Sequence, residues 1–205
     1  MAVLTRLKPA DLYRTSATEP AIVDVPAQVF AMVDGKGNPN VSQEFQDAIG
    51  ALYSAAYGLK FALKKLGVEY RVPPLEGLWW APDMRAFNLE RKGDYHWTLM
   101  IAMPEGTTVK AFEDVRAKTR QRKPSQALER MRLAEFREGL AAQVMHVGPY
   151  ATEATTIAKL HAFIHDHGYT FDGTRQKHHE IYLGDPRRAS PDKLKTVIRQ
   201  PISRA

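Results

Sequence analysis

The stretch HHEIYLGDPRR, near the end of the chain, carries the side chains best suited to chemistry. Its pattern is that of a β-strand, in which successive side chains point to opposite faces of a sheet. His178, Glu180 and Tyr182 therefore share one face, while Ile181 on the other face suits packing against a helix. An acid, a phenol and an imidazole on one face can bind a polar or cationic organic molecule. We predict a ligand site on this face.

Glu180 has two interpretations. As an acid on an exposed edge strand it would pair with Arg187 or Arg188, and such a surface pair contributes about 1 kcal/mol or less. Between aromatic rings it would lose water, which raises its pKa unless a cation or hydrogen-bond donors stabilise the charge. The ionised form binds a cationic ligand with the help of aromatic faces. A carboxylate of raised pKa acts as a general base on water, with Tyr182 orienting the acid or donating to a developing oxyanion.

The histidines do not predict a metal site. His178 and His179 point to opposite faces of a regular strand, so they cannot both bind one metal ion. His161 and His165 are one helical turn apart, but they lack the intervening glutamate of an HExxH arrangement, and a solvated helix face explains them. We predict no metal and no cofactor.

Composition excludes several classes of protein. The chain has 205 residues, 44% of them hydrophobic and 25% charged, which is typical of a globular protein. Its net charge is +6, but Lys and Arg are spread among acids, and no helix-turn-helix or zinc-finger spacing supports nucleic-acid binding.

The absence of cysteine excludes disulfides and thiolate chemistry. Without a signal core or a membrane span, we expect a soluble, cytoplasmic protein with no membrane partner. No sequence signal indicates the oligomeric state.

The first half of the chain contains four elements that would position a site. Alternating residues around 29–33 predict a strand, which ends at glycines and a proline. Ser42 is placed as the N-cap of a helix whose apolar residues recur at helical spacing as far as Leu66. The segments LEGLWW and 94–106 then predict two strands, the second with apolar residues on both faces.

The same order of elements recurs in the second half. A strand over 139–150 leads into a helix over 151–167, and strands follow at 177–185 and 194–203. Between the halves, residues 107–137 predict two helical pieces that are broken at Lys123-Pro124.

Both halves therefore have the order strand, helix, strand, strand, and Glu76 and Glu180 take equivalent positions in them. We predict an α+β fold in which two pseudo-symmetric modules form an antiparallel sheet, with helices on one face and a ligand groove on the other. The chain is predicted to be a single domain over 1–205, with module one at about 21–106, connecting helices at about 107–137 and module two at about 138–203.

These stretches together resemble the GyrI-like small-molecule-binding domain, the effector-binding fold of AraC and MerR regulators. The resemblance runs from Val23 to Ile202 and is carried by VFAMVDGKGNPN, LEGLWW, YHWTLMIAMPEG, HVGPY and HHEIYLGDPRRASPDKLKTVIRQPI. The chain resembles the stand-alone branch of this family, because no helix-turn-helix precedes Ala21. The resemblance implies a central ligand groove with a buried glutamate and aromatic residues as its floor.

Some stand-alone members are similar to cyclopropanoid hydrolases, which open the strained ring of DNA-alkylating natural products with a glutamate and aromatic residues. On this resemblance the family glutamate is Glu180 and its aromatic neighbour is Tyr182. Trp97 and one of Trp79 and Trp80 would form aromatic walls. Alternation relative to Glu76 favours Trp80, and a bulge after Gly77 would reverse that choice.

The predicted site residues are therefore Glu180 and Tyr182 as catalytic groups, with Glu76, Trp79, Trp80, Trp97, Tyr95 and His178 as ligand-binding groups. Glu76 would complete a two-carboxylate arrangement as a general acid, but the sequence does not set its distance from Glu180.

Three functions are compatible with these residues. The first is a binding module that sequesters or senses a hydrophobic small molecule, a cationic one included. The second is a hydrolase of cyclopropane rings with Glu180 as general base, which would confer drug resistance. The third is a protein that interacts with gyrase and inhibits it. We prefer the first, because binding is needed for the second as well, and catalysis requires a geometry that the sequence cannot show.

Overall fold

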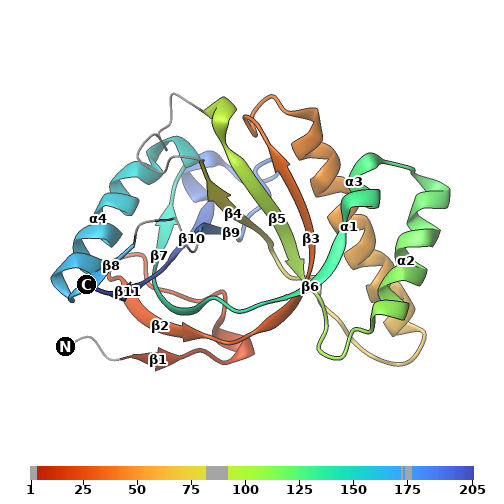
Figure 1. The fold of residues 1–205 in the computed structure, drawn as a ribbon, viewed down its shortest axis with the longest axis horizontal. Coiled ribbons are helices and arrows are strands. Elements are labelled where there is room, and N and C mark those ends of the chain that lie inside the picture. Colours follow the sequence, from red (N-terminus) through yellow and green to blue (C-terminus); the bar gives the residue numbers. More distant parts are fainter. Residues whose placement is uncertain (1–3, 82–91, 172, 174–176) are drawn as a thin grey trace. The chain divides into compact units, whose positions relative to one another are not determined.

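The structure is a computed structural model that describes residues 4–81, 92–171, 173 and 177–205 (Figure 1). The chain forms two compact units, and each is described by itself. The first unit comprises Met1–Ala27, Leu78–Trp80 and Arg137–Ala205, and the second comprises Gln28–Gly77 and Ala81–Phe136. Short 3-10 helices lie at Pro9–Asp11, Lys92–Asp94, Tyr150–Thr152 and Pro191–Lys193.

The second unit contains the predicted strand, helix, strand, strand in chain order. These are β3 (Gln28–Lys36), α1 (Gln43–Lys64), β4 (Leu75–Trp80) and β5 (His96–Ala102), where β4 contributes its first three residues to this unit. In the sheet β5 lies between β4 and β3. Helix α1 packs on β3 and β5. The predicted N-cap of α1 is confirmed, since the hydroxyl of Ser42 accepts a hydrogen bond from the backbone N–H of Phe45.

The segment between the two modules is only partly helical. Helices α2 (Val109–Arg122) and α3 (Gln126–Arg130) are separated at Lys123-Pro124, as predicted, and both pack on α1. The prediction of helix up to residue 137 is wrong, because Arg132–Phe136 form strand β6, which pairs antiparallel with β3. The free edge of β3 offers backbone hydrogen bonds that a helical segment could not use. Tertiary pairing therefore overrides the local helical preference.

The first unit repeats the arrangement of the second. Its elements are β7 (Gly139–Val147), α4 (Glu153–Asp166), β9 (His178–Tyr182) and β10 (Lys195–Pro201). Strand β10 lies between β7 and β9, as β5 lies between β3 and β4. In each unit the last strand of the module is thus inserted between the other two. This common order confirms the predicted α+β fold with its two similar antiparallel modules.

Further strands extend the first unit. Strand β2 (Ala21–Val25) pairs antiparallel with the outer edge of β7, and β1 (Thr5–Arg6) pairs parallel with β2. A separate two-stranded sheet joins β8 (Tyr169–Thr170) to β11 (Ser203–Arg204). One small cluster of buried side chains ties the N-terminal segment to β2 and β7: Leu7, Leu12, Val23, Val25 and Ala141.

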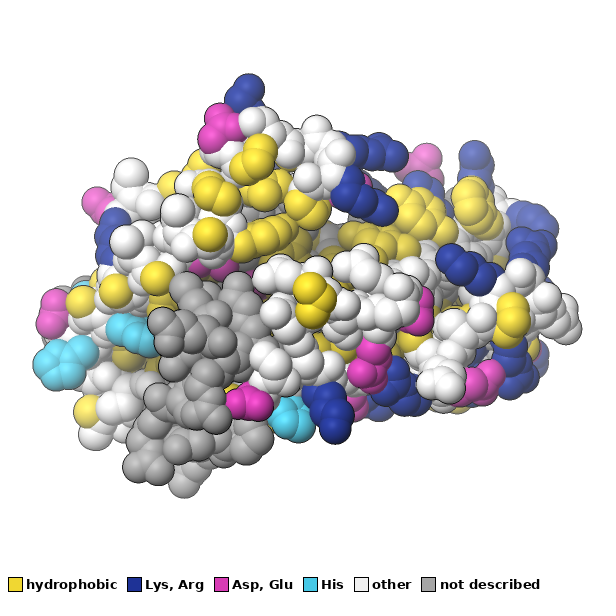
Figure 2. Space-filling view, turned by 90° about the horizontal axis from the view of Figure 1, so that it is seen from above, with side chains coloured by type: hydrophobic (Ala, Val, Ile, Leu, Met, Phe, Trp, Pro, Cys, Tyr) yellow, Lys and Arg dark blue, Asp and Glu magenta, His cyan; other side chains and the backbone are white. Residues whose placement is uncertain are grey.

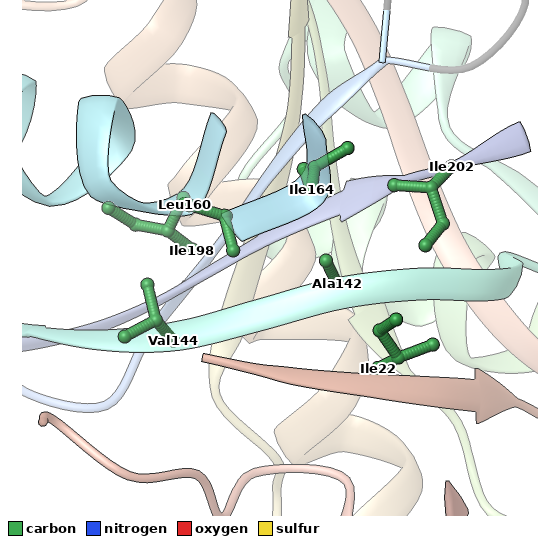
Figure 3. Close-up of a cluster of buried hydrophobic side chains, with 7 residues drawn as sticks. All are labelled: Ile22, Ala142, Val144, Leu160, Ile164, Ile198 and Ile202. Atoms are coloured by element: carbon green, nitrogen blue, oxygen red, sulfur yellow. The ribbon is translucent and has the colours of Figure 1, made fainter. Parts of the chain in front are cut away.

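The core of the first unit lies between α4 and the sheet. Figure 3 shows Leu160 and Ile164 of α4 beside aliphatic side chains of the strands. The complete cluster is Ile22, Ala142, Val144, Leu160, Ile164, Ile198 and Ile202. Burial of these apolar side chains holds α4 against β7 and β10.

The surface carries charges of both signs. On the face drawn in Figure 2, Lys and Arg side chains are interspersed with Asp and Glu. No helix in the part of the chain that the structure describes is both long and apolar enough to cross a membrane.

Candidate functional site

Glu180 accepts hydrogen bonds on both of its carboxylate oxygens. The Nε2 atom of His178 lies 3.1 Å from Oε1, and the hydroxyl of Tyr182 donates to Oε2 at 2.7 Å. The three side chains share one face of β9, as the alternation predicts. The side chain of Glu180 is 16% exposed and that of His178 is 4% exposed. Glu180 is therefore a largely buried carboxylate with two donors from its own strand.

This polar face is the one on which α4 packs. Glu180 is paired across the strands with Ile198, whose side chain lies in the core under α4. Directly paired residues in an antiparallel sheet point to the same face. The sequence had suggested helix packing on the opposite face, with Ile181. Alternation shows which side chains share a face, whereas the side on which a helix lies depends on the tertiary fold.

Trp79 extends the hydrogen bonds around Glu180. Its indole Nε1 donates to the hydroxyl oxygen of Tyr182 at 3.0 Å. The ring of Tyr150, just before α4, also meets the ring of Tyr182 edge to face, at 5.8 Å between centroids. The neighbouring Trp80 instead stacks under Lys177, whose Nζ lies 5.2 Å from the ring centroid. Trp79 therefore contacts the phenol that donates to the acid, whereas alternation relative to Glu76 had favoured Trp80.

The surroundings keep Glu180 ionised and Tyr182 protonated. Burial raises the pKa of Glu180, but the hydrogen bonds from His178 and from the Tyr182 hydroxyl lower it below its ordinary value. Burial raises the pKa of Tyr182 well above its ordinary value, and the Glu180 charge raises it further. The pair is therefore an anion held by a phenol that stays a donor. Such a group can hold a cation or accept a proton.

Two residues at this site were not selected from the sequence. Tyr150 contacts Tyr182, and the amide Nε2 of Gln200 on β10 lies 3.2 Å from Nδ1 of His178. Gln200 lies on β10, and its position relative to His178 depends on how β10 pairs with β9, which the local sequence does not show. Tyr150 follows a Gly-Pro pair that indicated a turn and nothing more. Neither position carried a local signal for the site.

The other predicted ligand residues belong to the second unit. Glu76 on β4 is 2% exposed, and Tyr95 is 7% exposed. Trp97 is fully buried, and its ring meets that of Phe45 at 5.2 Å in a perpendicular arrangement. These contacts place Trp97 in the packing between β5 and α1. Participation of these three residues in ligand binding stays a prediction.

A second buried cluster lies on the opposite face of β9. His179 Nδ1 is 2.9 Å from Glu138 Oε2, and Arg199 Nη1 donates to the same oxygen at 3.2 Å. Arg199 also donates to the side chain of Gln143 and to the backbone carbonyl of Leu12. Burial raises the pKa of Glu138, but His179 and Arg199 lower it below its ordinary value. This cluster joins the N-terminal segment to the strand that carries Glu180.

The described ranges hold no group of three or more His, Cys, Asp or Glu side chains that could bind a metal ion.

Comparisons with known proteins support the assignment of the fold. The family model of the GyrI-like small molecule binding domain matches residues 18–203. None of the curated proteins matches the chain.

Three solved structures, all from Listeria innocua, are similar along nearly the whole chain. An uncharacterized conserved protein is 38% identical, with a TM-score of 0.88, over 95% of this chain and 97% of its own. A protein described as a hydrolase is 36% identical, with a TM-score of 0.82, over 95% and 96% of the two chains. A second structure described as a hydrolase is 36% identical, with a TM-score of 0.84, over 98% and 100%.

The family resemblance noted from the EIYL and LEGLWW motifs is thereby confirmed over most of the sequence. The two similar modules, the buried glutamate on β9 and the matching family model agree with one another. The chain belongs to the GyrI-like small-molecule-binding domain family.

Proposed function

We propose that the chain binds a hydrophobic small molecule that carries a positive charge, and that Glu180 is the counter-ion. The observation that carries this proposal is a largely buried carboxylate whose two oxygens face the His178 imidazole and the Tyr182 hydroxyl. An ionised carboxylate that is largely out of water attracts an opposite charge more strongly than one in solvent. An organic cation would supply that charge.

The neighbouring groups favour an aromatic or aliphatic cation. A carboxylate can accept about four hydrogen bonds, and His178 and Tyr182 use two of these positions on Glu180. The ring of Tyr150 contacts that of Tyr182, and Trp79 donates to the Tyr182 hydroxyl, so aromatic rings adjoin the phenol that donates to Glu180. The negative faces of such rings attract cations. An anionic ligand would be repelled by Glu180. The proposed ligand class is therefore a lipophilic ammonium or phosphonium ion.

The test is calorimetric titration of the whole chain with a lipophilic phosphonium ion at pH 7. Glu180→Gln keeps the size of the side chain and removes its charge, and we expect binding to weaken about 10- to 100-fold, as for the loss of a charged partner. Glu105→Gln is the matched control, because Glu105 is an exposed acid, and it should bind as the wild type does. Equal affinity in wild type and Glu180→Gln would overturn the proposal.

A second candidate function is hydrolysis of strained cyclopropane rings. Two structures that are 36% identical to this chain are described as hydrolases, and the similarity spans nearly both chains. In this reaction Glu180 would take a proton from water while the water oxygen bonds to a ring carbon. The C–C bond of the ring breaks, its electron pair goes to the departing carbon of the substrate and the group conjugated with it, and this part of the substrate then receives the proton from Glu180. Tyr182 would hold the carboxylate in place through its hydroxyl.

The second candidate predicts turnover. A cyclopropane-bearing alkylating compound should lose its characteristic absorbance when it is incubated with catalytic amounts of the wild type. Glu180→Gln should stop this reaction, and Glu105→Gln should leave it unchanged. Tight stoichiometric binding without product would exclude the hydrolase and agree with the binding module.

A further inference from the structure

Gln200 is connected to the acid through His178. Its amide Nε2 lies 3.2 Å from His178 Nδ1, and the opposite ring atom, Nε2, lies 3.1 Å from Glu180 Oε1. Gln200 is 1% exposed and His178 is 3% exposed, so both side chains are buried. The amide, the imidazole and the carboxylate thus form a buried row.

The chemical nature of the amide and the carboxylate sets the direction of these hydrogen bonds. An amide nitrogen donates only, so Nδ1 of His178 must accept and carries no proton. A neutral imidazole then has its proton on Nε2, which faces Glu180 and donates to it. In the other tautomer, an unprotonated Nε2 would face the carboxylate, and two acceptors would repel each other. The position of the Gln200 amide therefore selects the tautomer that Glu180 needs.

We propose that Gln200 is a positioning residue, which holds His178 in the Nε2–H tautomer and thereby orients Glu180 toward its ligand. This inference rests on the proposed function of Glu180. Two rows of donors then converge on one carboxylate. Gln200 donates to His178, which donates to Oε1, and Trp79 donates to Tyr182, which donates to Oε2. Hydrogen bonds in such rows polarise and strengthen one another.

A second imidazole approaches this row from α4. Burial lowers the pKa of His161, and its hydrogen bond with Gln200 opposes this shift. His161 is exposed to solvent, unlike His178. A test must therefore separate the signals of the two rings.

Nitrogen-15 NMR of the whole chain with labelled histidines reports the protonation of each ring nitrogen. The signal of His178 is assigned by its loss in His178→Gln. In the wild type at pH 7 we expect His178 to be neutral with its proton on Nε2. Gln200→Met keeps the volume of the side chain and removes the hydrogen-bond donor. In this variant the His178 ring should no longer be held in the Nε2–H tautomer alone. In Gln200→Glu, an acceptor faces Nδ1, and the ring should become an imidazolium.

The same variants are then titrated with the phosphonium ion. Gln200→Met should weaken binding about 3- to 10-fold, in proportion to one lost hydrogen bond. The control is Thr196→Val on the same strand, because Thr196 is fully buried and its hydroxyl has no hydrogen-bond partner among the described residues. Thr196→Val should change neither the His178 signal nor the affinity for the phosphonium ion. Thermal unfolding of each variant checks that it is folded.

A wild-type His178 that is an imidazolium, or that carries its proton on Nδ1, would overturn the inference. So would a ring signal or an affinity that is unchanged in Gln200→Met. The NMR result needs no ligand. If the wild type fails to bind the cation, the proposed function fails, and the tautomer still decides whether Gln200 positions His178.

Discussion

Replacement of Arg199 by Met is expected to lower the free energy of unfolding by about 3–5 kcal/mol, as for the loss of one partner from a buried ion pair. Arg199 and Glu138 are 2% and 1% exposed, and they contact each other at 3.2 Å. The Met side chain would fill the space but would leave the Glu138 carboxylate with a buried charge and a weaker partner. The hydrogen bond to the Leu12 carbonyl, at 2.6 Å, would also be lost.

The measurement is urea unfolding followed by circular dichroism at pH 7. Arg187→Met is the matched control, because Arg187 pairs with Asp185 on the surface and is 81% exposed. Its effect should stay within about 0.5 kcal/mol. A double variant, Arg199→Met with Glu138→Leu, should be more stable than Arg199→Met alone, since no charge remains unpaired. Similar stabilities for Arg199→Met and the control would show that the cluster does not stabilise the fold.

The same cluster predicts a pH dependence. The native pKa of Glu138 lies below its ordinary value of 4.5. Its contribution to stability is therefore complete above pH 4.5 and is lost as the pH falls from there toward the native pKa. In Arg199→Met, the loss of the cation raises the native pKa of Glu138. Unfolding curves between pH 7 and pH 3 should show a smaller loss of stability with acid in this variant than in the wild type.

Replacement of Gly35 by Ala is expected to destabilise the second unit by up to about 3 kcal/mol, as for overpacking of a core. A Cβ atom at this position would lie 2.1, 2.3 and 2.7 Å from three ring atoms of Trp97. Trp97 is fully buried against Phe45 and cannot rotate away without displacing α1. Gly35 is in extended strand β3 and does not have a positive φ. The expected effect is therefore steric, since Ala fits this backbone conformation.

Thermal unfolding of Gly35→Ala and Gly50→Ala provides the comparison. Gly50 lies in α1, and a Cβ added there meets no atom within 4 Å. Alanine is the better helix former, so Gly50→Ala should stabilise the chain by about 0.5–1 kcal/mol. Combining Gly35→Ala with Trp97→Leu should restore part of the lost stability by making room. An unfolding temperature for Gly35→Ala that matches the wild type would contradict the close packing of Gly35 on Trp97.

The sequence correctly predicted the GyrI-like family and the order of strands and helix in each of the two modules. Ser42 and the helical spacing after it are local signals, and α1 begins where they indicate. The common face of His178, Glu180 and Tyr182 follows from alternation alone. Each of these features depends on residues that are a few positions apart in the chain.

Features that join distant segments were decided by the tertiary structure. Residues 132–136 form a strand because the edge of β3 is available to them, which their own sequence does not reveal. Trp79 reaches Tyr182, 103 positions away, and Gln200 reaches His178 from another strand. The register of β9 on β10 also decides that Glu180 lies on the face of α4.

The sequence by itself therefore determined the family, the order of elements within the two modules and the acid of the proposed site. The tertiary structure alone decided which side chains donate to that acid and which helix lies over it. The physical reason is the range of the interactions. Periodicity and capping act within a few residues, whereas strand register and side-chain hydrogen bonds between strands form only when distant segments are brought together.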